Sequence, residues 1–339
     1  MAEYLYERVD AVLYDPVAAN RAATAACLQG IGFRKIEHAA DIESLARLTE
    51  ERAVDLILCE VAGVEGEICA FIQSLRNGRA AANPFAVVMA TTWRRDANIV
   101  NEVVNAGADD LIARPFSAAT IETRIRTLLE RRKPFVISAE YAGPDRRRDS
   151  SRSGQECMDV VNPLAVKADS SLSEKRAEQN IAEAVNEGRR ILHHEKIRSD
   201  AFQMCVMWRV LEQRRPSGND FSEILARMKR FCDDIKWRAA DSGRADTGKL
   251  CDAVNDSLSA IETMTKIAVL SGGTALLEFG PPMNLLSHAV MTLGQVLAPD
   301  EVKASKLIEL DELVARIDVR RTPRGPAGPK VTSHRSQTG

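Results

Sequence analysis

Four polar residues stand at the ends of short apolar runs in the first third of the chain. Asp15 follows AVLY, Glu60 follows LILC, Thr92 ends VVMATT, and Arg114 comes shortly after DDLI. Continuous apolar runs are typical of strands covered on both faces of a parallel sheet, and the carboxyl ends of such strands meet at one edge. We therefore expect two carboxylates, a hydroxyl and a guanidinium to form one site.

The pattern around these residues predicts an α/β domain over residues 9–133. Strands are expected at 9–15, 35–39, 55–60, 85–92 and 111–114, separated by amphipathic stretches. One helix is expected between Asp96 and Gly107, and another between Ser117 and Pro134, because apolar residues recur there at helical spacing between capping residues. The expected fold class is a doubly wound, five-stranded parallel sheet, followed by an all-α domain.

The segment AGADDLIARPF, residues 106–116, resembles a motif of the receiver domain of two-component response regulators, which typically shows AGADDYLxKPF. The run DLILCE and Thr92 add to the resemblance, which covers about residues 9–133. In that family an aspartate at the end of the third strand accepts a phosphoryl group. Two acids after the first strand help it to hold Mg²⁺.

Three departures from the family pattern fall in this site. Glu60 stands where the family has the acceptor aspartate, Pro16 replaces the second acid after the first strand, and Arg114 replaces a lysine. A nucleophile displaced by about 1 Å loses much of its reactivity. Mg²⁺ also tolerates few changes in its octahedral oxygen shell. A planar guanidinium prefers paired contact with carboxylates.

These departures predict a pseudo-receiver in which Glu60 pairs with Arg114 and Thr92. We expect no enzyme activity, no cofactor and no metal, with Asp15 as the ligand only if Mg²⁺ is bound. The predicted function is that of a response-regulator-like protein of bacterial two-component signal transduction that acts through protein contacts. The alternative hypothesis is an active phosphorelay component, with its phosphoacceptor at Glu60 or a phosphotransfer histidine at His193.

Residues 134–172 have the composition of a linker, rich in Arg, Gly, Pro and Ser, and nothing in them predicts a core. They contain YAGPDRRR, residues 141–148. Arg146, Arg147 and Arg148 could together bind a phosphate, a nucleotide or an acidic surface. A nucleotide or nucleic-acid effector is therefore a further alternative, although a solvated linker is the simpler interpretation.

Only the helical period is visible over residues 173–319, which predicts a helical domain. Its first helix could run from 173 to 214, either broken near Gly188 or projecting as a stalk. His193 and Lys196 have the HxxK spacing of histidine phosphotransfer modules. The simpler interpretation is that both lie on a solvated face of the helix. Residues 320–339 are expected to form a disordered basic tail.

Composition limits the classes of partner. The chain has 339 residues, of which 45% are hydrophobic and 28% charged, and a formal net charge of −2. This balance is typical of a globular protein and gives no reason to expect nucleic acid or a membrane as partner. We expect a cytoplasmic protein with protein partners. The resemblance also implies a homodimer through a face that would carry Arg124, Arg126 and the pair Asp109–Asp110.

Overall fold

The computed structural model describes residues 4–79, 81–94, 96–146, 157–214, 219–241, 245–270 and 280–303. The chain divides into two compact units. Unit 1 comprises Met1–Asp200 and Trp237–Ala245, and unit 2 comprises Ala201–Lys236 and Asp246–Gly339.

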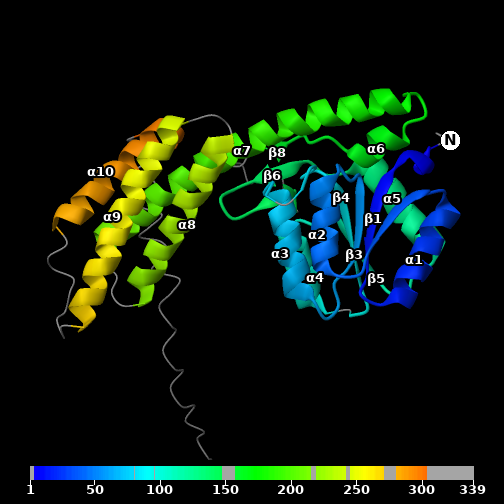
Figure 1. The fold of residues 1–339 in the computed structure, drawn as a ribbon, viewed down its shortest axis with the longest axis horizontal. Coiled ribbons are helices and arrows are strands. Elements are labelled where there is room, and N and C mark those ends of the chain that lie inside the picture. Colours follow the sequence, from blue (N-terminus) through cyan, green and yellow to red (C-terminus); the bar gives the residue numbers. More distant parts are fainter. Residues whose placement is uncertain are drawn as a thin grey trace, which may run out of the picture. The chain divides into compact units, whose positions relative to one another are not determined.

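The main sheet of unit 1 has five parallel strands in the order β2-β1-β3-β4-β5 (Figure 1). The strands are β1 (Asp10–Tyr14), β2 (Lys35–Ala39), β3 (Leu56–Glu60), β4 (Val87–Thr92) and β5 (Asp110–Ala113). The helices between and after them are α1 (Ala18–Ile31), α2 (Ile42–Glu51), α3 (Glu65–Arg76), α4 (Ala97–Ala106) and α5 (Ala118–Arg131). A short 3-10 helix, η1 (Tyr6–Arg8), precedes β1. All five expected strands and the doubly wound α/β class are confirmed.

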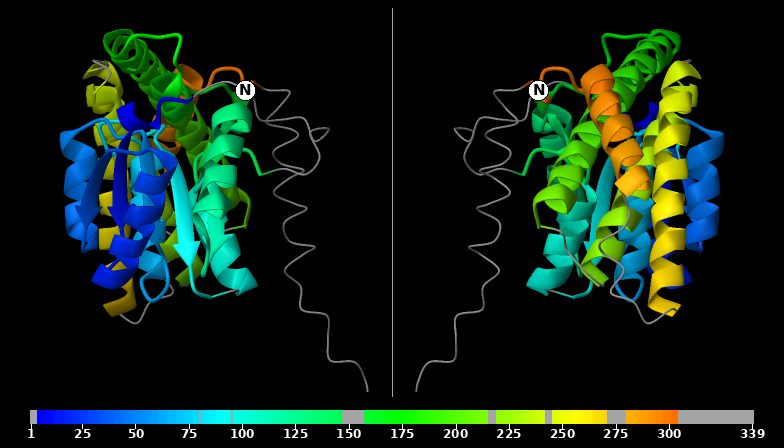
Figure 2. Two further views of the ribbon diagram at one scale, coloured as in Figure 1. Left: turned by 90° about the vertical axis from the view of Figure 1, so that its right-hand side faces the viewer. Right: turned by 90° about the vertical axis from the view of Figure 1, so that its left-hand side faces the viewer.

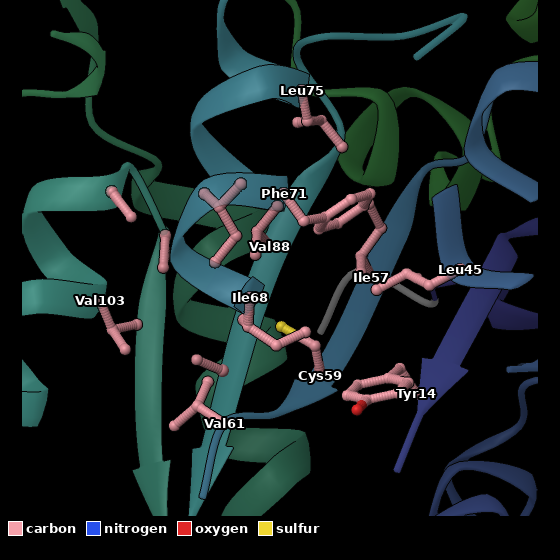
Figure 3. Packing of buried hydrophobic residues seen from close by; sticks show 14 of the residues in the cluster. Tyr14, Leu45, Ile57, Cys59, Val61, Ile68, Phe71, Leu75, Val88 and Val103 are labelled. Carbon is pink, nitrogen blue, oxygen red and sulfur yellow. The ribbon is translucent and has the colours of Figure 1, made fainter. Parts of the chain in front are cut away.

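Alternation along the strands places apolar side chains on both faces of this sheet. On one face Ile57 and Val88 pack with Leu45 of α2 and Phe71 of α3 (Figure 3). On the other face Leu13 and Leu58 pack with Leu28 of α1 and Ile125 of α5. Because both faces are covered, the central strands β1, β3 and β4 are largely buried, and their carboxyl ends are held in fixed positions.

The two helices with the clearest sequence signals have the predicted caps. The Asp96 side chain accepts a hydrogen bond from the Asn98 amide at 2.8 Å, and Gly107 ends α4 in the left-handed conformation at φ 108°. The Ser117 side chain caps α5 by accepting from the Thr120 amide. Arg114 lies between Gly107, which ends α4, and Ser117, which begins α5.

The structure differs from the expected linker over residues 134–172. This segment contains β6 (Phe135–Ile137), β7 (Ala142–Pro144) and β8 (Cys157–Met158), which form an antiparallel sheet, followed by α6 (Pro163–Ala168). Phe135 is buried beneath the guanidinium groups of Arg76 and Arg132, 5.1 and 5.2 Å from the ring centre. The predicted linker is therefore wrong. These strands are too short to show a sequence pattern, and contacts with the rest of unit 1 hold them in place.

The YAGP part of the linker motif packs against the predicted AGAD motif. A Cβ built on Gly143 would lie 3.0 Å from the Gly107 Cα and 2.7 Å from the Tyr141 hydroxyl. The Tyr141 hydroxyl donates to the Pro144 carbonyl at 2.8 Å. Two glycines are thus required where these two backbone segments approach each other.

Helix α7 (Glu174–Arg214) runs without a break, which contradicts the alternative of an interruption near Gly188. Gly188 serves packing instead, because a Cβ there would lie 2.6 Å from Cε2 of Phe85. The helix starts in unit 1 and ends in unit 2.

Unit 2 is helical in its described part, as predicted. It contains the end of α7, most of α8 (Asn219–Asp241), α9 (Ala245–Leu270) and α10 (Gly280–Leu297), which Figure 2 shows from two sides. Its buried apolar residues recur at helical spacing and include Met204, Trp208, Leu225, Met228, Val254, Leu258, Leu286 and Val290. The end of the predicted helical domain, residues 304–319, and the predicted basic tail lie outside the described residues. Among the residues described, no helix has the length and apolar character required to cross a membrane.

Candidate functional site

The carboxyl edge of the sheet brings together the polar residues predicted from the strand ends. Asp15 follows β1, Glu60 ends β3 and Arg114 follows β5. All three are buried, with 0%, 3% and 7% of their surface exposed. Buried charges are costly unless they are paired, so the contacts between these two acids and the arginine determine whether the site is stable.

Arg114 lies between the two carboxylates and contacts both. Its Nε donates to Glu60 Oε2 at 2.7 Å, and its Nη2 donates to Asp15 Oδ2 at 3.1 Å. The same Nη2 lies 3.1 Å from the hydroxyl of Thr24 on α1. The guanidinium therefore bridges β1, β3 and α1 as a fixed cation.

The remaining carboxylate oxygens also accept hydrogen bonds within the chain. Glu60 Oε1 accepts from the Ala62 amide at 3.0 Å, and Oε2 accepts a second bond from the Thr91 hydroxyl at 2.8 Å. Asp15 Oδ1 accepts from the Val17 amide at 2.9 Å. All four carboxylate oxygens are engaged, as buried polar groups generally are.

Thr91, rather than Thr92, is the hydroxyl of this site, which corrects the prediction. Glu60 and Thr91 are register partners in the β3–β4 ladder, so their side chains share a face of the sheet. The next residue, Thr92, has the opposite parity, and its hydroxyl accepts from the Arg94 amide at 3.1 Å. The sequence pattern identifies the strand end but not which of two adjacent threonines faces the acid.

Two aromatic rings flank the buried guanidinium. The Phe116 ring centre lies 4.6 Å from Arg114 Cζ, and that of Trp93 lies 5.8 Å away. Trp93 is half-exposed, so it separates the guanidinium from solvent while presenting one side outward. Such cation–π contacts stabilise an arginine in place.

This site does not fit the Mg²⁺ that the family resemblance implies. A magnesium ion needs oxygen ligands in near-octahedral order, and each oxygen of Asp15 and Glu60 already accepts a hydrogen bond. Pro16 supplies no carboxylate. The positive charge that the two acids require comes from Arg114.

Helices on both faces, together with the strand order β2-β1-β3-β4-β5, make up the flavodoxin-like arrangement, in which sites form at the carboxyl ends of the strands. Unit 1 has the receiver fold. The short strands β6–β8, α6 and the first part of α7 are additions to it.

Comparisons with solved structures find receiver domains. The chain is similar to a signal receiver domain of a histidine kinase from Clostridium thermocellum, with 20% identity over 36% of this chain and 98% of that one, at a TM-score of 0.32. It is also similar to a response regulator from Thermotoga maritima, with 23% identity over 36% and 98% and a TM-score of 0.31. The response regulator DrrB of Thermotoga maritima, an OmpR/PhoB homologue, covers 53% of this chain and 90% of its own, with 16% identity and a TM-score of 0.33. No protein-family model and no curated protein matches the sequence.

His193 and Lys196 lie inside unit 1 rather than on a solvated face. His193 is 4% exposed, its Nδ1 lies 3.2 Å from an Asp241 carboxylate oxygen, and its ring centre is 5.3 Å from that of Trp237. Lys196 is 2% exposed and donates to the Ala139 carbonyl at 3.0 Å. A phosphotransfer histidine must reach an acceptor on another protein, so this burial does not favour that role.

The predicted anion-binding arginines are only partly covered by the structure. Arg146 is half-buried after β7, whereas Arg147 and Arg148 lie outside the described residues. Their binding role stays a prediction.

Unit 1 contains a second buried ion cluster, which was not predicted from the sequence. Asp109 accepts from Arg76 Nη2 at 2.7 Å and from Arg132 Nε at 2.8 Å, and its side chain is 1% exposed. Burial would raise the pKa of Asp109, but the guanidinium groups of Arg132 and Arg76 hold it below its usual range. Asp109 is therefore absent from the surface expected to form a homodimer, whereas Asp110 pairs with Arg124 at 3.6 Å and Arg126 pairs with Glu122 at 2.9 Å.

Proposed function

We propose that this chain is a pseudo-receiver response regulator of two-component signal transduction, which acts through protein contacts and not through phosphorylation. The observation that carries the proposal is the Arg114 guanidinium between Asp15 and Glu60, where it contacts both carboxylates. The pocket thus holds a permanent ion pair in place of a metal ion and a transferable phosphoryl group.

Phosphoryl transfer requires a carboxylate oxygen that can attack in line, and a cation that neutralises the incoming charge. Glu60 Oε2 already accepts from Arg114 and Thr91, and Oε1 accepts from the Ala62 amide. Both acceptor positions of Oε2 are occupied, so an attack by this oxygen would break a buried hydrogen bond and leave its donor unpaired, which is costly. The hydrogen bonds of Glu60 therefore argue against its phosphorylation.

Signalling without phosphorylation requires that partners recognise a fixed conformation of unit 1. The surface of β5 and α5 presents the Asp110–Arg124 and Glu122–Arg126 ion pairs, which are partly or largely exposed. We propose that partner proteins, or a second copy of the chain, recognise this charged surface. Charged surfaces of this kind mainly contribute specificity and association rate.

The experiment is exposure of the purified full chain to acetyl phosphate with Mg²⁺, followed by intact-mass spectrometry. We expect no addition of a phosphoryl group, under conditions in which a functional receiver domain run in parallel is modified. A stoichiometric addition that maps to Glu60 would overturn the proposal in favour of a working acceptor. Addition at His193 would instead support the phosphorelay alternative.

A further inference from the structure

Two buried cysteines meet where α8 and α9 pack together in unit 2. Cys232 and Cys251 are each 0% exposed and lie 19 residues apart in the sequence. The Cys232 thiol donates to the backbone carbonyl of Cys251 at a distance of 3.2 Å. The sulfur of one cysteine is therefore held against the residue that carries the other.

Other cysteines of the described residues have different surroundings. Cys205 is also buried in unit 2, but its thiol donates to the Val290 carbonyl at 3.6 Å. Cys59 belongs to the apolar core of the main sheet. Cys157 is exposed, and its sulfur lies 3.7 Å from an Asp145 carboxylate oxygen. Among these residues, only Cys232 and Cys251 combine full burial with direct contact between two cysteines.

The protonation chemistry of the pair gives the two thiols different roles. The interaction between the two cysteine side chains raises the pKa of Cys232, and burial raises it further. The same interaction lowers the pKa of Cys251, although burial opposes that shift. Cys251 is therefore the sulfur that ionises first, and the thiolate is the reactive form.

We propose that Cys232 and Cys251 form a reversible disulfide when the protein meets hydrogen peroxide. In the first step the Cys251 thiolate attacks one peroxide oxygen, an S–O bond forms, the O–O bond breaks, and the departing hydroxide takes up a proton as water. In the second step the Cys232 sulfur loses its proton and attacks the sulfenic acid, an S–S bond forms, and a second water leaves. Two thiols are oxidised by two electrons, and one peroxide is reduced to two waters.

The consequence would be a covalent link between α8 and α9. Peroxide must reach the buried pair during a local opening of the helix contact, so oxidation is expected to be slower than at an exposed thiol. The new bond closes a short loop, which restricts the unfolded chain and stabilises unit 2.

The test uses the full chain with Cys157→Ser, which removes the exposed thiol that could link two molecules. The protein is treated with hydrogen peroxide, free thiols are blocked, and intact mass and peptide mapping are recorded. We expect the loss of two hydrogens, a peptide joining Cys232 to Cys251, and full reversal by dithiothreitol. The melting temperature of the oxidised form should be higher by roughly 5 °C.

Matched variants separate this pair from general oxidation. Cys232→Ala and Cys251→Ala should each abolish both the loss of two hydrogens and the rise in melting temperature, whereas Cys205→Ala should retain both. Circular dichroism checks that each variant is folded. The proposal is overturned if the pair stays reduced while Cys157 of the unmodified chain is oxidised, or if the disulfide joins other cysteines.

Discussion

Arg114 determines what the pocket at the carboxyl edge can do. Its guanidinium is buried between Asp15 and Glu60, with hydrogen bonds of 3.1 and 2.7 Å. Two carboxylates without a cation would repel each other and leave buried charges uncompensated. The arginine is therefore the structural centre of the site.

Removal of this cation should destabilise the protein strongly. We expect Arg114→Ala to lower the free energy of unfolding by roughly 3–5 kcal/mol, because Asp15 and Glu60 would stay buried without their partner. Urea denaturation followed by circular dichroism measures this change. Arg114→Lys is the matched control, since it retains the charge and should cost less. A variant Arg114→Ala as stable as the unmodified chain would show that the ion pair contributes nothing.

Asp55, at the opposite end of β3, predicts a pH dependence. It is buried and accepts from the Asp10 amide at 2.9 Å, and burial raises its pKa to about 7. Because this folded-state pKa exceeds the unfolded value, the folded chain binds the extra proton and loses stability as the pH rises through 7.

The variant Asp55→Asn can still accept the Asp10 hydrogen bond but has no proton to lose. Between pH 5 and pH 8 the unmodified chain should lose roughly 2–3 kcal/mol more unfolding free energy than Asp55→Asn. Urea denaturation at the two pH values gives the difference. Equal pH dependence of the two proteins would contradict the assignment.

At the residue scale, the sequence predicted which side chains gather but not every contact. Asp15, Glu60 and Arg114 were found because strand ends in a parallel sheet share an edge. Thr91 was missed in favour of Thr92, because adjacent residues of a strand point to opposite faces and an apolar run does not fix the parity at its end. The Asp109 cluster was missed because its partners Arg76 and Arg132 lie at the carboxyl ends of helices α3 and α5, where a pattern of polar residues at strand ends gives no signal.

At the scale of elements, long patterns were predictable and short ones were not. The five strands and the capped helices α4 and α5 carry period and capping signals over several residues. Strands β6 to β8 have two or three residues each, so their sequences have no period, and their position depends on contacts such as Phe135 with Arg76 and Arg132. Residues 304–319 of the predicted helical domain lie outside the described residues, and their helical structure stays a prediction.

The fit of α7 against Phe85 can be tested with a single methyl group. Gly188→Ala improves helix propensity by about 1 kcal/mol, but the new Cβ would overlap Phe85, and such overpacking costs about 1–3 kcal/mol. We expect a lower melting temperature, measured by circular dichroism. In Gly30→Ala on α1, no atom lies within 4 Å of the new Cβ, so that control should be neutral or stabilised. A more stable Gly188→Ala would mean that the helix does not lie close to Phe85.

At the scale of the whole molecule, α7 is the element that the two units share. It runs from Glu174 to Arg214, and the boundary between the units falls after Asp200. A continuous helix can transmit a local change from one unit to the other, because each turn is hydrogen-bonded to the next. Unit 1 and unit 2 thus each contain part of the same continuous helix.

Ser199→Pro should break this framework near the boundary. Proline removes one helix hydrogen bond and clashes with the preceding turn, at a cost of about 3 kcal/mol. Hydrogen–deuterium exchange should then accelerate in α7 on both sides of residue 199, whereas Ser199→Ala should leave exchange unchanged. Acceleration on one side alone would show that the units do not share the helix as a cooperative element.

Calorimetric titration of the full chain with Mg²⁺ measures whether the Arg114 guanidinium has replaced the metal ion of a receiver pocket. We expect no binding by the unmodified chain, and restored binding when Pro16→Asp, Glu60→Asp and Arg114→Lys are combined. Saturable binding of one Mg²⁺ to the unmodified chain, abolished by Asp15→Asn, would contradict it.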